Sequence, residues 1–138
     1  MNADRAFLDT NVFVYLYSKT ELNKSARISS VIGAYQRIIS TQVLNEFCNV
    51  CIRKMKFPAM FIKRAVEEIC EMSELYEVND LTIVNALSIH EKYGYAYYDS
   101  LMIASALEYD CQYLLTEDMA DGQVIEGRLT IKNIFSNL

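Results

Sequence analysis

Short apolar runs alternate with helical stripes of apolar residues along this chain, a pattern that predicts strands separated by helices. Ala6-Phe7-Leu8 is an apolar run, Asp9-Thr10-Asn11 favours a turn, and the apolar segment 12–17 continues as a helix. Helical spacing over 24–34 is followed by a second short apolar run at 35–40. The first third of the chain is therefore expected to form strand, helix, helix and strand in that order.

The middle of the chain is predicted to be mostly helical. Positions 42–55 carry a broad apolar stripe, and Thr41 is the expected N-cap of this helix. Pro58 ends the helix and begins another, because proline is excluded from a helix interior but suits the first helical turn. The other elements expected here are a short strand at 76–78 and helices at 80–93 and 98–109.

The last third is expected to complete a sheet. An apolar strand at 112–116 and a strand with alternating polarity at 129–135 flank a turn-rich loop at 117–127. Strands separated by helices predict an α/β fold, a three-layer α/β/α sandwich with a largely parallel central sheet. A length of 138 residues is close to the commonest domain size, so residues 1–138 are expected to form one domain.

Composition and charge exclude several classes of protein. The chain is 52% hydrophobic, and it has neither the apolar core of a signal peptide nor an apolar stretch long enough to span a bilayer, so a cytoplasmic protein without a membrane partner is expected. A net charge of −5 argues against nucleic-acid binding through a broadly basic surface. Free thiols rather than disulfides or zinc ligands are expected of the four cysteines, which are Cys48, Cys51, Cys70 and Cys111.

Two aspartates follow predicted strands directly. Asp9 comes after Ala6-Phe7-Leu8, and Asp118 comes shortly after Tyr113-Leu114-Leu115. Ligand sites of parallel α/β sheets lie beyond the carboxyl ends of the strands, so both carboxylates are expected in one shared crevice. Either aspartate alone is also an ordinary turn residue.

Two further acids belong to predicted helices. Asp99 stands at the start of the helix predicted at 98–109, where capping and the helix dipole favour aspartate. Glu46 falls at the edge of the apolar stripe of 42–55 and faces a boundary of the core. A plain N-cap and a surface ion pair are the structural alternatives for these two residues.

Taken together, the four acids predict a site for a hard cation. They are Asp9, Glu46, Asp99 and Asp118. Two like charges about 4 Å apart repel by about 4 kcal/mol at an effective dielectric constant of about 20, so four clustered carboxylates need cations or extra protons. Mg²⁺ or Mn²⁺ suits these oxygen ligands, whereas zinc prefers the nitrogen and sulfur ligands that are scarce here.

A cation at this site predicts hydrolysis of a phosphodiester by a metal-activated water. The cation lowers the pKa of the water and neutralises charge on the departing 3′ oxygen. Thr116 and Asn11 are expected to orient the carboxylates that bind the metal, although both residue types also form turns. Two-histidine ribonuclease chemistry is excluded because the general acid and the general base would both have to come from His90, the one histidine. His90 is expected to be structural.

The order and separation of four motifs make the chain resemble the PIN-domain nucleases over nearly its whole length. Phe7-Leu8-Asp9-Thr10-Asn11 resembles the first motif, and Glu46 is similar to the second acid. Tyr98 to Ala106 looks like the third motif, and Leu114-Leu115-Thr116-Glu117-Asp118 looks like the fourth.

Within that family, the size and the stretch 121–127 look most like the VapC-type toxins of bacterial toxin–antitoxin pairs. Asn133-Ile134-Phe135 departs from the Asn-Pro-Phe ending of many such toxins. The resemblance implies an endoribonuclease that a cognate antitoxin protein holds inactive and that forms a homodimer.

Two groups of residues outside the acids are candidates for RNA contact. Arg53, Lys54 and Lys56, with Lys63 and Arg64 nearby in sequence, form a basic segment that is expected either to guide an RNA backbone or to be a solvated helix face. The tyrosines before Asp99 are expected to stack on bases, form a dimer contact or pack in the core. They are Tyr93, Tyr95, Tyr97 and Tyr98.

Two alternatives to a toxin remain open. One is a housekeeping nuclease that acts in RNA maturation or on DNA. The other is a non-catalytic α/β interaction module whose acids only cap helices and turns. A cation-dependent rise in melting temperature that Asp9→Asn abolishes separates an enzyme from such a module.

Overall fold

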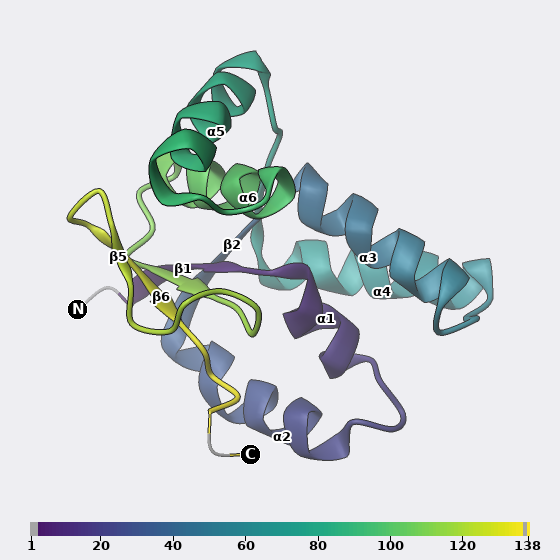
Figure 1. Ribbon diagram of the computed structural model, residues 1–138. Helices are drawn as coiled ribbons and strands as arrows, with labels where there is room; N and C mark the ends of the chain where they lie inside the picture. The colour runs from purple at the N-terminus through teal and green to yellow at the C-terminus, as the bar shows by residue number, and fades with distance from the viewer. Residues whose placement is uncertain (1–2, 137) are drawn as a thin grey trace.

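The computed structural model describes residues 3–136 and 138, and its centre is a twisted sheet (Figure 1). The described strands form one six-stranded sheet in the order β3-β2-β1-β4-β6-β5. All neighbouring strands are parallel except β5, which runs antiparallel to β6. The strands are β1 (Asp4–Leu8), β2 (Tyr35–Ser40), β3 (Glu74–Tyr76), β4 (Tyr113–Leu115), β5 (Val124–Ile125) and β6 (Leu129–Lys132).

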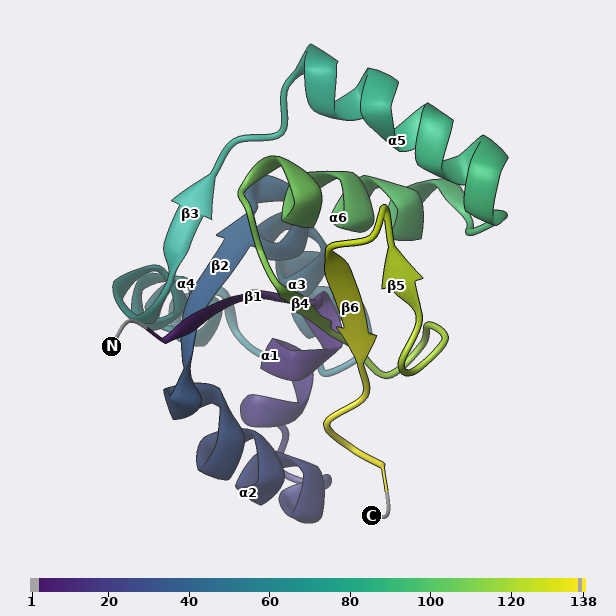
Figure 2. The same ribbon diagram turned by 90° about the vertical axis from the view of Figure 1, so that its left-hand side faces the viewer.

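Helices cover both faces of the sheet, which confirms the predicted sandwich with a largely parallel sheet. Figures 1 and 2 show α5 and α6 on one face and α1 and α2 on the other, with α3 and α4 packed beside each other. The helices are α1 (Thr10–Leu16), α2 (Leu22–Val31), the 3-10 helix η1 (Ile32–Ala34), α3 (Thr41–Arg53), α4 (Ala59–Met72), α5 (Asp80–Tyr93) and α6 (Tyr97–Glu108).

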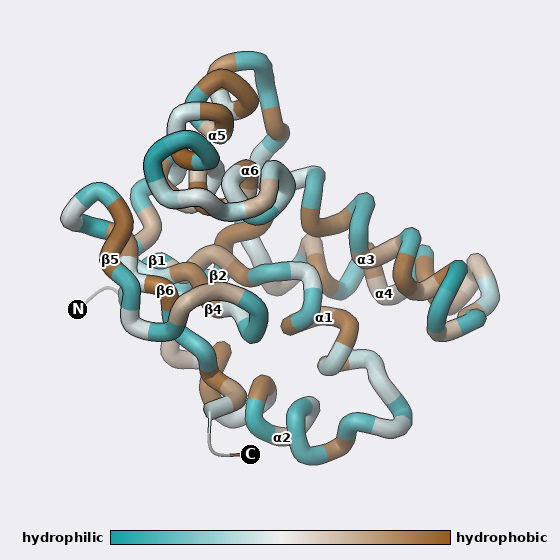
Figure 3. The backbone as a smooth tube through the Cα atoms, in the orientation of Figure 1, coloured by the Kyte–Doolittle hydropathy of each residue, from teal (hydrophilic) through white to brown (hydrophobic). Residues whose placement is uncertain are grey.

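The core lies where the central strands meet the helices. Phe7 and Leu8 of β1 and Leu114 and Leu115 of β4 have no exposed surface, as expected for parallel strands covered on both faces. The strands are correspondingly hydrophobic in Figure 3, whereas the helix turns farther from the sheet contain both hydrophobic and hydrophilic residues. In α6 every residue from Ser100 to Leu107 is buried, because this helix lies between the sheet and α5.

Several local predictions were wrong at the ends of elements. Ser40, not Thr41, is the N-cap of α3, and the Thr41 hydroxyl instead accepts a hydrogen bond from the backbone N–H of Val78. The strand predicted at 76–78 is β3, two residues earlier. The last strand ends at Lys132 because the chain then turns, with the side chain of Asn133 accepting a hydrogen bond from a backbone N–H two residues on.

The cysteines and the segment after β4 complete the comparison with the expected elements. All four cysteines are free, and Cys51 and Cys111 are buried. The predicted loop 117–127 contains one short strand, β5. Across residues 3–136 and 138, we find no helix with both the length and the apolar character needed to cross a membrane.

Candidate active site

The site begins where the two central strands of the sheet end side by side. In the pairing of β1 with β4, Leu8 lies opposite Leu115, so the next residues, Asp9 and Thr116, leave the sheet together. The Asp9 backbone N–H continues the pairing by donating to the Leu115 carbonyl at 3.0 Å. The Thr116 hydroxyl donates to Oδ2 of Asp9 at 2.6 Å.

Asp9 is a buried carboxylate held in one orientation. Its Oδ1 accepts a hydrogen bond of 2.6 Å from the Thr10 backbone N–H at the start of α1, and the side chain is 5% exposed. Burial raises the pKa of Asp9 from 3.8 to about 6, against the hydrogen bonds from Thr116 and Thr10. The negative charges of Asp118 and Asp99 raise this pKa further.

Glu46, on α3, lies near the carboxyl ends of β1 and β4, where its carboxylate contacts Thr10. Its Oε1 accepts a hydrogen bond from the Thr10 hydroxyl at 3.2 Å, and its Oε2 accepts one from the Gln42 amide at 2.7 Å. The same Gln42 nitrogen donates to the Tyr98 carbonyl at 3.0 Å, so one buried amide ties α3 to the start of α6. We did not anticipate Gln42, although its position four residues before Glu46 places both on one helix face.

Asp99 lies in the first turn of α6 but does not cap it. The N-cap is Ala96, so the interpretation of Asp99 as a plain N-cap is wrong. No hydrogen bond or ion pair from the residues that the structure describes reaches its half-buried carboxylate. The pKa of Asp99 is raised by burial and then by the negative charges of Asp118 and Glu46.

Asp118 lies in the loop that follows β4. Its Oδ2 accepts a hydrogen bond of 2.7 Å from the Asn11 amide, and its backbone N–H donates to the Thr116 hydroxyl at 3.2 Å. The neighbouring Glu117 differs, because its carboxylate pairs with Lys24 at 2.7 Å. Among the described residues, a cation therefore neutralises Glu117 but not Asp118.

The four predicted acids share one electrostatic neighbourhood without a countercharge. The pKa of Asp9 responds to Asp99 and Asp118, and that of Asp99 responds to Asp118 and Glu46. No lysine or arginine among the described residues forms an ion pair with any of the four. Within the same residues, no three metal-ligating side chains are arranged to hold a metal ion as the site stands. The acids influence one another's charge but do not form a closed cage.

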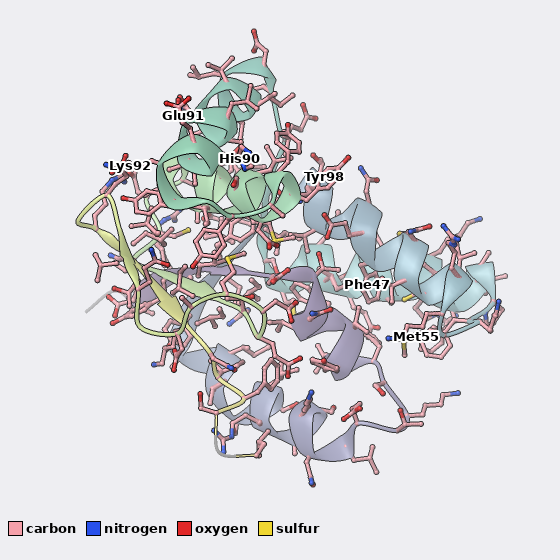
Figure 4. All side chains as sticks on the ribbon, in the orientation of Figure 1. Phe47, Met55, His90, Glu91, Lys92 and Tyr98 are labelled. Atoms are coloured by element: carbon pink, nitrogen blue, oxygen red, sulfur yellow. The ribbon has the colours of Figure 1, made fainter. Side chains whose placement is uncertain are left out.

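The predicted basic segment lies away from the four acids. Arg53 is seven residues beyond Glu46 on α3, which corresponds to about 10 Å along the helix axis. Lys54 and Lys56 follow in the turn after that helix, and all three side chains are exposed. In Figure 4, Met55 lies beyond the end of α3, whereas Phe47, next to Glu46 in the sequence, lies midway along the helix.

His90 and the tyrosines that precede Asp99 in the sequence lie in several different environments. The ring of His90, on α5, contacts the Tyr95 carbonyl, in line with the structural role expected for it. Tyr93 and Tyr95 pack against the core, whereas Tyr98 is 65% exposed at the start of α6. Of the predicted site residues, the acids, Thr116 and Asn11 therefore come together, and the basic segment does not.

Comparison with solved structures finds chains with a similar fold. A toxin–antitoxin complex from Klebsiella pneumoniae contains a chain with a TM-score of 0.71 and 15% identity, covering 94% of this chain and 98% of that chain. Mycobacterium tuberculosis VapC20, a sarcin–ricin loop cleaving toxin, has a TM-score of 0.66 and 13% identity, covering 79% and 86%. DNA-bound VapBC from Salmonella typhimurium has a TM-score of 0.66 and 15% identity, covering 95% and 98%. At these identities the likeness shows the fold.

Sequence comparison identifies the family. The search of curated proteins found no match. The profile of the PIN domain, in contrast, matches residues 6–120, a span that includes all four acids. This match covers most of the chain, and the protein therefore belongs to the PIN domain family.

Proposed function

We propose that this protein is a metal-dependent endoribonuclease, the toxin of a toxin–antitoxin pair, and that its catalytic residues are Asp9, Glu46, Asp99 and Asp118. The observation that carries the proposal is that these four carboxylates lie near the carboxyl ends of the central strands, influence one another's charge and form no ion pair with a described lysine or arginine. Membership of the PIN domain family supports a nuclease. The solved structures with this fold, which include a sarcin–ricin loop cleaving toxin, support the toxin assignment.

The side chains of the site fit a hard divalent cation, Mg²⁺ or Mn²⁺. All four groups offer carboxylate oxygens. The pKa values of Asp9 and Asp99 are raised first by burial and then by neighbouring negative charge, and a bound cation would offset that charge. An open arrangement also suits Mg²⁺, which is commonly held by one or two carboxylates together with substrate phosphates and water rather than by a complete protein cage. The four acids are the residues that would hold the ion.

The chain's own contacts organise the acids for this chemistry. When bound, the cation supplies a water of lowered pKa and offsets charge on the departing 3′ oxygen. Thr116 and the Thr10 N–H fix both oxygens of Asp9, while Asn11 orients Asp118. The Gln42 amide and the Thr10 hydroxyl direct the two oxygens of Glu46. Such outer contacts set the angles at which carboxylates meet a metal.

A cognate antitoxin protein and a second copy of the chain are the protein partners that we propose. Several solved structures with this fold are toxin–antitoxin assemblies, some of them bound to DNA. The expectation of a homodimer comes from the family resemblance. Light scattering on the purified chain, with and without the product of a neighbouring small reading frame, measures both assemblies.

RNA cleavage by matched variants tests the catalytic assignment. The protein is expected to cut RNA with Mg²⁺ or Mn²⁺, to stop in EDTA, and to leave 5′ phosphate and 3′ hydroxyl ends, because water is the nucleophile. Asp99→Asn should abolish cleavage while the protein stays folded. Asp80→Asn is the matched control, since Asp80 also lies in the first turn of a helix, α5, but outside the site.

The same experiment includes results that contradict the proposal. Undiminished cleavage in EDTA would exclude the metal, and 2′,3′-cyclic phosphate ends would indicate attack by the 2′ hydroxyl instead of water. Full activity in any two of Asp9→Asn, Glu46→Gln, Asp99→Asn and Asp118→Asn would exclude the four-acid site. A protein without cation-dependent stabilisation or cleavage would be the non-catalytic module.

A further inference from the structure

An open cavity adjoins the candidate active site between α3 and the first turn of α6. Its volume is about 540 Å³, within the range of small-ligand sites. Two of its lining residues connect it to the acids, since Glu46 is itself one of the four and Tyr98 precedes Asp99 in the chain. A group bound in this cavity therefore lies beside the carboxylates.

Tyr98 offers this cavity a fixed aromatic surface. The side chain is 65% exposed, although large aromatic side chains are usually covered. Its position is set from two sides, because its carbonyl accepts the Gln42 hydrogen bond and the ring of Tyr97 packs edge-on at 5.3 Å between centroids. Exposed, fixed aromatic rings are the platforms on which unpaired bases stack. Figure 4 shows Tyr98 at the end of α6 that faces the start of α3.

The opposite wall consists of uncharged amides. Asn45 and Asn49 lie one turn apart on α3, and both side chains are exposed. Each amide carries both hydrogen-bond donors and an acceptor, which is the combination that the edge of a nucleobase requires. Val78 and Leu101 add apolar surface to the cavity.

The charges around the cavity favour a base over a phosphate. None of the described residues that line it is lysine or arginine, and its one charged lining residue is the carboxylate of Glu46. A phosphate would be repelled here unless a cation accompanied it, whereas an uncharged base is not. An aromatic ring, two amides and an apolar floor instead match the two surfaces of a base, its face and its edge.

We propose that this cavity binds one nucleobase of the RNA, from a nucleotide next to the scissile phosphate, and thereby gives cleavage a base preference. The inference rests on the proposed function, since it places the scissile phosphate at the four acids. Tyr98 stacks on the base, and Asn45 and Asn49 bind its edge. The acids thus hold the reacting phosphate while α3 and Tyr98 select the nucleotide.

Binding of free nucleosides tests the cavity without requiring metal or cleavage. A nucleoside carries no phosphate, so the acids do not repel it. Each of the four ribonucleosides is titrated into ¹⁵N-labelled protein in EDTA, and the side-chain amide signals of Asn45 and Asn49 are followed by NMR. At least one nucleoside should shift them saturably. Tyr98→Phe should retain this binding, and Tyr98→Leu should weaken it at least about fivefold because leucine lacks an aromatic face.

Cleavage of an RNA with a randomised segment supplies the second measurement. Sequencing of the cut ends should show a base preference in the wild type that Tyr98→Leu and Asn45→Ala each weaken. Asn85→Ala is the matched control, because Asn85 is an exposed asparagine on α5 outside this cavity. It should leave the preference unchanged.

The outcomes separate the two proposals. Absence of cleavage by the wild type contradicts the proposed function, while nucleoside binding still tests the cavity. Unchanged base preference in Tyr98→Leu and Asn45→Ala, or no saturable shift with any nucleoside, overturns the base site. A change of oligomeric state in Tyr98→Leu with unaltered nucleoside binding also overturns it, because Tyr98 would then be a protein contact.

Discussion

The Thr116 hydroxyl donates a 2.6 Å hydrogen bond to the Asp9 carboxylate across neighbouring parallel strands, although the two residues are 107 positions apart in the sequence. The pairing of Leu8 with Leu115 places the two residues side by side once the sheet forms. Thr116 has no exposed surface, so its hydroxyl is unavailable to bulk water and serves the carboxylate and the Asp118 backbone N–H.

Replacing this hydroxyl should weaken the site without unfolding it. Thr116→Val keeps the shape of the side chain but removes a donor to the charged form of Asp9, so the pKa of Asp9 in the metal-free protein should rise further. Affinity for Mn²⁺ should fall about 10- to 100-fold. Carboxyl ¹³C NMR and calorimetric Mn²⁺ titration measure the two effects. Thr116→Ser should behave as the wild type, and equal Mn²⁺ affinity in the valine variant would contradict the role assigned to the hydroxyl.

The metal-free protein should lose stability as the pH rises from about 4 to about 6. Asp9 has a folded-state pKa of about 6 against an ordinary value of 3.8, so the folded state binds more protons than the unfolded state in this window. The free energy of unfolding therefore decreases with pH there, by about 3 kcal/mol from this group, and Asp9 contributes no further change above about pH 6.

Asp9→Asn isolates this effect. The variant should lose this part of the pH dependence and be more stable than the wild type at pH 7 in EDTA, because no buried carboxylate remains to ionise. Urea unfolding at pH 4 and pH 7 makes the comparison. A variant that is less stable than the wild type at pH 7 would show that the hydrogen bonds of Asp9 outweigh its burial.

Gln42 is expected to act through Glu46 and the start of α6. Gln42→Met keeps the length of the side chain but removes the amide that joins the Glu46 carboxylate to the Tyr98 carbonyl. Cleavage should fall about 10- to 100-fold. Stability should change by less than about 2 kcal/mol, because the variant also removes a buried amide oxygen that has no partner among the described residues.

Kinetics and unfolding of the same preparations measure both quantities for Gln42→Met. Gln36→Met, at an exposed position on β2, is the control for a surface glutamine. Normal cleavage by the Gln42 variant would mean that Glu46 keeps its orientation without the amide.

The basic segment at the end of α3 should affect binding rather than catalysis. Changing Arg53, Lys54 and Lys56 together to glutamine should weaken RNA binding and lower the slope of log affinity against log salt by up to about 2, which is about 0.7 for each lost contact to a single strand. The cleavage rate at saturating RNA should not change. Lys92→Gln, on α5, is a control with one charge removed elsewhere. An unchanged salt slope would identify the segment as a solvated helix end.

The sequence predicted the parts of the site that depend on where strands end. Asp9 and Asp118 follow apolar runs that pair in the sheet, and Thr116 lies between the second run and Asp118, so their common location follows from a parallel sheet. The role of Gln42 was not predictable in this way. Its amide donates to the Tyr98 carbonyl, 56 positions away, and this contact between α3 and the start of α6 is a tertiary feature that no local pattern encodes.

The wrong local predictions have physical causes of the same kind. Asp99 was a plausible cap, but α6 begins earlier, with the Ser100 N–H donating to the Ala96 carbonyl in its first turn. The strand β5 was missed because two residues carry no periodicity, and it exists only through pairing of Val124 and Ile125 with β6. The residue at which an element ends therefore depends on contacts with other elements, whereas a helix marked by a long apolar stripe can be predicted from its own sequence.

Asp9 directly follows β1, Asp118 lies in the loop after β4, Glu46 lies midway along α3 and Asp99 lies in the first turn of α6, so no single supersecondary unit contains all four acids. The proposed catalytic centre thus depends on the fold of the whole domain. In urea, residual cleavage should decline along the same curve as the circular dichroism signal, because separation of any one element removes an acid. An inactivation midpoint at a distinctly lower urea concentration would instead reveal that one of these elements detaches before the rest of the domain unfolds.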